Sequence, residues 1–108
     1  MKQYLYVFRG GRAAYQDQSP EEMQAHMERW GSWMQKISAI GHPLQEEGKV
    51  VAKAGEVVTD GPFTEGKEVV GGYVAISAED IDQAVEMSKE CPIFEYEGTV
   101  EVREIIEM

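Results

Sequence analysis

The chain has 108 residues, about the size of one small domain, so residues 1–108 are expected to form a single unit. Its 20 acidic and 10 basic residues give a formal net charge of −10, which argues against nucleic acid and anionic membranes as partners. The apolar run in the opening MKQYLYVFRG is about five residues long, too short for a signal sequence or a membrane span. A cytoplasmic protein is therefore expected.

The first half of the sequence predicts a strand followed by a helix. Tyr4–Phe8 is a β-branched and aromatic run without a breaker, which indicates a strand. Ser19 followed by Pro20 is typical of a helix start, with serine as the N-cap and proline in the first turn. Apolar residues then recur at steps of three and four as far as Ile40, and Gly41 with Pro43 supplies stop signals. The apolar positions of this helix are Met23, Met27, Trp30, Trp33, Met34, Ile37 and Ile40.

The second half predicts a hairpin, a strand, a helix and a last strand. The valine-rich segments at 49–52 and 56–59 flank a short connection with a glycine, as in a β-hairpin. Val69–Ser77 predicts a strand in which Gly71-Gly72 allows a bulge or the close approach of another backbone. A helix capped by Ser77 is expected to end before Pro92. Thr99–Arg103 alternates apolar and polar residues, as a strand with one buried face does.

This order of elements predicts an α+β fold, a ferredoxin-like split βαβ unit with an added β-hairpin. Two helices would cover one face of its sheet. Tyr4, Tyr6 and Phe8 point to one side of the first strand, and Leu5 and Val7 point to the other. Because both sides are apolar, we expect a homodimer that is packed sheet against sheet.

Several motifs in one order resemble a known family. The longest is TDGPFTEGKEVVGGY at 59–73, which is followed by DQAV at 82–85 and VEVR at 100–103. The helix start at 19–23, His26-Met27 and Gly41-His42-Pro43-Leu44 also match. On these residues the chain resembles the YCII-related family, specifically its DGPF-containing branch. It departs from the common pattern at Gly66 and Glu104, and neither position carries chemistry.

The resemblance implies a bacterial protein with a dimeric α+β barrel fold, in which two ferredoxin-like units pair through their sheets and leave a cleft in each subunit. It also implies a histidine with nearby acidic residues in that cleft. Some relatives act on small aromatic or lactone-like molecules. Others are encoded beside extracytoplasmic-function sigma factors, which implies a regulatory setting.

His26 is the first candidate catalytic residue. It lies three residues after Met23 and four before Trp30, so it shares the apolar face of the predicted helix and is expected to point inward. An imidazole titrates near neutrality and suits general acid or base chemistry. The alternative is a hydrogen-bonded, inert core histidine. Trp30 is a candidate ligand-binding residue, since its ring could stack on an aromatic ligand.

The loop at 59–68 supplies the other candidates. Asp60 could accept backbone hydrogen bonds in the turn, or orient His26 and so act as a second catalytic residue. Phe63 is expected to pack into the core or form a pocket wall. Lys67 and Glu68 could be a solvated pair or could bind ligand, with Lys67 suited to an anion.

Metal and cofactor chemistry find little support in the sequence. His26 and His42 show neither HxH nor HxxxH spacing, so no metal site is expected. The glycine pairs lack the order of a phosphate-binding loop, and no cofactor is predicted. No GxSxG motif occurs, which removes the usual indication of a hydrolase. The single Cys91 is interpreted as a buried structural thiol.

Three functions remain open from the sequence. The first is a small cofactor-independent enzyme that uses His26 as general acid or base on a small polar or aromatic molecule, with Asp60 and Lys67 in support. The second is a module that binds a small ligand without turnover. The third is a regulatory interaction protein linked to sigma-factor signalling.

Overall fold

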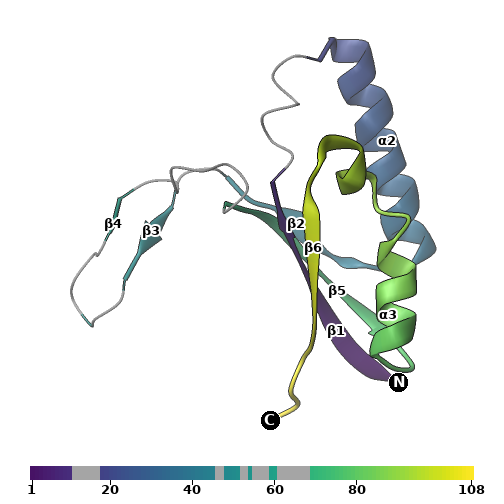
Figure 1. Ribbon diagram of the computed structural model, residues 1–108, viewed down its shortest axis with the longest axis vertical. Coiled ribbons are helices and arrows are strands. Elements are labelled where there is room, and N and C mark those ends of the chain that lie inside the picture. The colour runs from purple at the N-terminus through teal and green to yellow at the C-terminus, as the bar shows by residue number, and fades with distance from the viewer. Residues whose placement is uncertain (11–17, 46–47, 52–53, 55–58, 61–68) are drawn as a thin grey trace.

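The computed structural model describes residues 1–10, 18–45, 48–51, 54, 59–60 and 69–108, and for residues 50, 59 and 60 it describes the backbone alone. These residues form a mixed α+β unit with a four-stranded antiparallel sheet and two α-helices (Figure 1). In chain order the elements are β1 (Lys2–Arg9), α2 (Pro20–Lys36), β2 (Ile40–Pro43), β3 (Lys49–Val50), β4 (Thr59–Asp60), β5 (Val70–Ala78), α3 (Ile81–Ser88), the 3-10 helix η2 (Pro92–Tyr96) and β6 (Thr99–Glu104).

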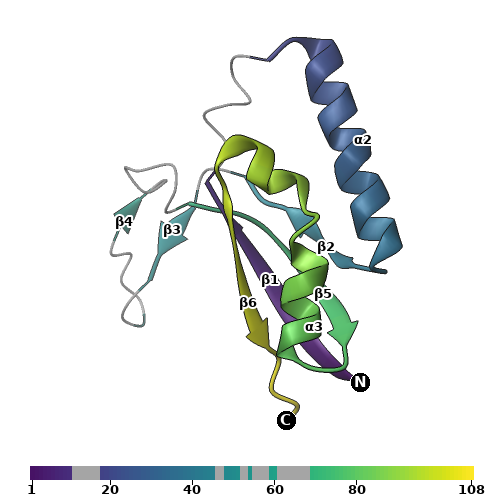
Figure 2. The same ribbon diagram turned by 45° about the vertical axis from the view of Figure 1, so that its right-hand side comes forward.

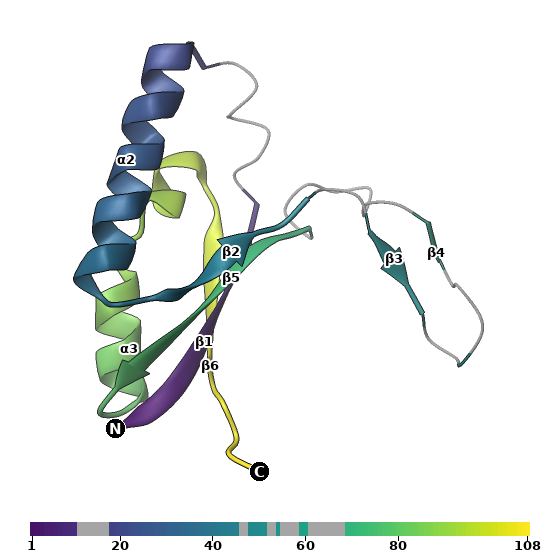
Figure 3. The same ribbon diagram turned by 180° about the vertical axis from the view of Figure 1, so that it is seen from behind.

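The main sheet has the strand order β2-β5-β1-β6, so the first strand of the chain lies in its interior. Both helices lie on the same side of this sheet (Figures 1 and 3). The short strands β3 and β4 pair with each other and form a separate two-stranded sheet beside it (Figure 2). This pairing agrees with the predicted hairpin, whose connection lies largely outside the described residues.

Helix α2 begins where the sequence predicts. Ser19 is the N-cap, its Oγ accepts a hydrogen bond from the Glu22 backbone N–H at 3.1 Å, and Pro20 is the first helical residue. The helix ends at Lys36, however, earlier than the apolar pattern indicates, and Ser38 takes a positive φ of 54°. Ile40 belongs instead to the unpredicted edge strand β2, so it does not extend the helical stripe.

Helix α3 starts later than expected. Asp80, and not Ser77, is its N-cap, with a carboxylate that accepts from the Gln83 backbone N–H at 2.9 Å. Ser77 stays in β5, where its Oγ accepts a hydrogen bond from Gln3 on the neighbouring strand at 2.8 Å. The helix ends before Pro92, as predicted. Within the described part of the chain, no helix is both long and apolar enough to cross a bilayer.

The core lies between the sheet and the helices and is built on aromatic rings. Tyr6 and Trp33 stack with ring centroids 5.9 Å apart, and Phe8 meets Trp30 edge to face at 5.1 Å. Tyr6 and Trp33 donate hydrogen bonds to backbone carbonyls of α3. The Tyr6 hydroxyl donates to Ala84, and Trp33 Nε1 donates to Met87 O at 3.0 Å. Burial raises the pKa of Tyr6 to about 12, which keeps this hydroxyl a donor.

The opposite face of the sheet carries no helix and is partly apolar. Leu5 and Val7 are half-buried, and they face Ala75 and Tyr73 across the β1–β5 ladder. Ile40 of β2 lies beside Ala75 of β5, and this isoleucine is 77% exposed. The prediction that both sides of β1 are apolar is therefore confirmed.

The glycine pair of β5 does what its sequence predicts. Phe8 pairs with Gly72 and Arg9 pairs with Val70, so Gly71 is the extra residue of a β-bulge. Strand β2 approaches the same strand closely. A Cβ on Gly41 would lie 2.0 Å from the carbonyl oxygen of Tyr73, which only a glycine avoids. The bulge and this close contact shape the strand ends next to α2.

Candidate functional site

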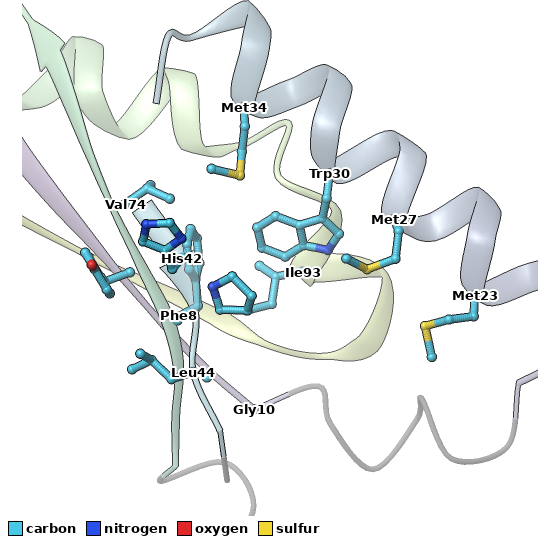
Figure 4. Close-up of a pocket in the computed structure, with 14 residues that line it drawn as sticks. Phe8, Gly10, Met23, Met27, Trp30, Met34, His42, Leu44, Val74 and Ile93 are labelled. Carbon is cyan, nitrogen blue, oxygen red and sulfur yellow. The ribbon is translucent and has the colours of Figure 1, made fainter. Parts of the chain in front are cut away.

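A pocket with a volume of about 450 Å³ lies between α2 and the ends of the strands. Figure 4 shows Met23, Met27, Trp30 and Met34 projecting from α2 toward Phe8 and Ile93. The strand side is formed around the β5 bulge and edge strand β2. The lining residues on that side are Gly10, His42, Pro43, Leu44, Gly71, Gly72, Tyr73 and Val74.

The walls of this pocket are mainly apolar. None of its described lining residues is Asp, Glu, Lys or Arg. His42 and Tyr73 are the polar rings among them. These two residues face each other across β2 and β5 and share the open face of the sheet with Val7. On the helix side the lining is therefore aromatic, aliphatic and thioether in character.

The indole of Trp30 is held in place by His26, one helical turn earlier. Trp30 Nε1 donates a hydrogen bond to His26 Nε2 at 2.8 Å, an arrangement that the i, i+4 spacing on α2 allows. His26 has an exposed fraction of 0%, whereas Trp30 is half-buried and lines the pocket. The imidazole therefore lies behind the indole and does not line the cavity.

The other side of His26 faces an ion pair at the surface. His26 Nδ1 lies 3.6 Å from Glu95 Oε2, and Arg29 holds the same carboxylate with two nitrogens, at 2.8 Å and 3.1 Å. The ring of Tyr96, next to Glu95 on η2, meets the imidazole edge to face at 4.4 Å. A continuous set of contacts thus runs from the surface at Arg29 to the pocket wall at Trp30.

Burial lowers the pKa of His26 below its ordinary value of 6.5. The charge of Glu95 acts in the opposite direction, and that of Arg29 adds to the lowering. The imidazole is therefore neutral at neutral pH. Because Nε2 accepts from Trp30, the proton of the neutral ring resides on Nδ1, toward Glu95.

Comparison with known proteins identifies the family. A family model described as the YCII-related domain matches residues 12–108, far more than half of the chain. The chain belongs to the YCII-related family. A search of curated proteins found no sequence similar to it.

The structure brings together two of the predicted site residues of this YCII-related chain. His26 and Trp30 are hydrogen-bonded, and Trp30 lines the pocket. The backbone of Asp60 is described in β4, paired with Lys49, but its side chain is not. The predictions for Phe63, Lys67 and Glu68 lie outside the described residues.

Some residues of the site were missed by sequence reasoning. Met23 and Met27 belong to the apolar stripe that the sequence predicts for this helix, and the structure places them on the pocket wall. Met27 is 53% exposed, so it is not a core residue. Glu95 gave no signal, because it lies on a 3-10 helix far from His26 in sequence.

The prediction that Cys91 is a buried thiol is confirmed. It is buried, with 3% of its surface exposed, and burial raises its pKa to about 12. Within the described ranges, no group of three or more His, Cys, Asp or Glu side chains could hold a metal ion.

The lowered pKa of His26 predicts a pH dependence of stability. The unfolded chain takes up a proton at about pH 6.5, before the folded chain does, so this contribution is complete above pH 6.5 and is lost as the pH falls through the folded value. In His26→Gln, the Gln oxygen can still accept from Trp30 but does not titrate. Between pH 7.5 and 5.5 the free energy of unfolding of the wild type should fall more than that of His26→Gln, by up to about 1.4 kcal/mol per pH unit.

Urea unfolding of both proteins at each pH measures this difference. All other groups are the same in the two proteins, so their contributions cancel in the comparison. A difference that increases in favour of the wild type as the pH falls would contradict the lowered pKa, because it would mean that Glu95 dominates over burial.

Proposed function

We propose that this YCII-related chain binds a small, uncharged molecule with an aromatic ring in the pocket beside Trp30. The observation that carries the proposal is a wall of fixed orientation: the indole is held from behind by His26 and lines an apolar cavity of about 450 Å³. Cavities of roughly 300–1,000 Å³ with apolar linings are typical of small-molecule sites.

The preference for a neutral molecule follows from the chemistry of the walls. Moving a charged group from water into an apolar site is costly unless a counter-charge or several hydrogen bonds await it. No charged side chain is among the described lining residues. An aromatic ring, in contrast, can stack on Trp30 and contact the polarisable sulfurs of Met27 and Met34.

The catalytic assignments from the sequence stay predictions. His26 as general acid or base would need contact with a bound molecule, and Trp30 separates its Nε2 from the cavity. The roles of Asp60, Phe63, Lys67 and Glu68 likewise stay predictions, because the structure does not describe their side chains. Binding is the function that the described geometry supports best.

The binding proposal predicts that charge on the pocket wall weakens binding. Met27→Glu places a carboxylate on the lining of the helix side, and Gln35→Glu adds the same charge at an exposed position of α2 outside the lining. Calorimetric titration with 2-naphthol, a neutral aromatic probe, should show binding to the wild type and to Gln35→Glu. Affinity for Met27→Glu should fall about tenfold, equivalent to about 1.4 kcal/mol.

A second probe tests the charge preference directly. 2-Naphthoate has the same ring system with a carboxylate, and it should bind the wild type more weakly than 2-naphthol does. Equal loss of 2-naphthol binding in Met27→Glu and Gln35→Glu, or tighter binding of 2-naphthoate, would refute the proposed site.

We further propose that the chain is a member of the DGPF branch with a ferredoxin-like topology, and that it forms a homodimer through the open face of its sheet, as in a dimeric α+β barrel. The strand order β2-β5-β1-β6 with both helices on one side supports the topology. Leu5, Val7 and Ala75 support the dimer, because an apolar sheet face without a cover favours burial against a second copy.

The dimer predicts a charge-sensitive interface. Val7→Lys places an ammonium group in the middle of the open face, and Ile106→Lys makes the same change in the exposed segment after β6. Light scattering during gel filtration should give a dimer for the wild type and Ile106→Lys, and a monomer for Val7→Lys. A wild-type monomer, or a dimer that persists unchanged in Val7→Lys, would disprove this interface.

A further inference from the structure

We propose that His26 is a positioning residue that holds the Trp30 indole as a pocket wall only while its imidazole is neutral, so that acid releases the wall and weakens ligand binding. The ligand part of this inference rests on the proposed function. The positioning of the indole does not, because it concerns two side chains of the ligand-free chain.

The geometry of the pair makes the hydrogen bond depend on protonation. Indole Nε1 is always a donor, and His26 Nε2 can accept from it only while it carries no proton. The two nitrogens are 2.8 Å apart. Protonation of Nε2 would place two N–H groups against each other at that distance, so the indole and the imidazolium could not both keep their positions.

Burial opposes protonation of His26, and the charged groups around the ring act in both directions. Glu95 on η2 lies 3.6 Å from Nδ1 and favours the imidazolium, while Arg29 on α2 is paired with the same carboxylate and opposes it. The ring of Tyr96 on η2 packs against the same imidazole in an edge-to-face arrangement. A histidine with a carboxylate on one side and an indole donor on the other has two states, and only the neutral one retains the bond to Trp30.

The consequences of losing that bond fall on the pocket. Trp30 packs edge to face against Phe8 and Trp33, at centroid distances of 5.1 Å and 5.7 Å, and lines the cavity. An indole that turns away from an imidazolium changes the wall on which a ligand ring would stack. Binding should therefore be weaker in acid although the ligand itself does not titrate.

The chain offers a matched internal control, because it has two tryptophans whose indole groups donate to different acceptors. Trp30 donates to the titratable imidazole of His26, whereas Trp33 Nε1 donates to the backbone carbonyl of Met87, which does not titrate. Both indole N–H groups give separate signals in a 1H–15N spectrum, and both come from the same helix.

The test follows the two indole signals of the ligand-free wild-type protein from pH 7.5 to pH 5. The Trp30 signal should shift along a one-proton curve with its midpoint below 6.5, while the Trp33 signal stays in place and reports an intact core. In His26→Gln the Trp30 signal should not titrate. A Trp30 signal that does not move in the wild type, or that still titrates in His26→Gln, would overturn the inference.

A binding arm extends the test to the ligand. 2-Naphthol is neutral throughout this range, and its affinity for the wild type should fall at least about threefold between pH 7.5 and 5.5, with a smaller change for His26→Gln. An equal fall in both proteins would overturn the link between His26 and the wall. Absence of 2-naphthol binding at every pH would defeat the proposed function, while the indole titration would still decide the positioning role.

Discussion

The hydrogen bond from Trp30 Nε1 to His26 Nε2 links the buried interior of this YCII-related chain to its pocket. The imidazole of His26 is fully buried, and the indole of Trp30 is half-buried. The indole therefore satisfies a polar nitrogen in the interior and also forms a wall of the pocket. Trp33, one turn further along α2, stacks on Tyr6 in the core. The same helix thus contributes Trp33 to the core and Trp30 to the wall of the cavity.

Much of the fold could be predicted from local chemistry. Ser19 and Pro20 mark the start of α2 because the cap and the first turn use only neighbouring residues. The bulge at Gly71 follows from a glycine pair in a strand. Strand β2 was missed because Gly41 was interpreted as a helix stop signal. In the structure this glycine allows a close tertiary contact with the Tyr73 carbonyl, which the local sequence does not reveal. The sequence placed the N-cap of α3 at Ser77. In the structure Ser77 is paired within β5, and Asp80 is the N-cap.

The candidate site was predictable only in part, for a related reason. Helical spacing brings His26 and Trp30 together on the inner face, and it does not reveal which side chain screens the other from a cavity. Glu95 approaches His26 only through the packing of η2 on α2, which no local pattern encodes. The edge strand β2 that completes the pocket is likewise a product of strand pairing. The catalytic interpretation of His26 rested on its inward direction, on the acid-base chemistry of an imidazole and on the family resemblance. The hydrogen bond to Trp30 adds a second, structural use for the same ring.

The tautomer of His26 is the most direct test of the hydrogen bond that fixes the Trp30 indole. Long-range 1H–15N correlation of the imidazole at pH 7.5 distinguishes a ring protonated on Nδ1 from one protonated on Nε2. We predict a neutral ring with its proton on Nδ1 and an unprotonated Nε2 that accepts from Trp30. A neutral ring protonated on Nε2, or an imidazolium at this pH, would contradict it, because neither can accept the indole hydrogen bond that fixes the pocket wall.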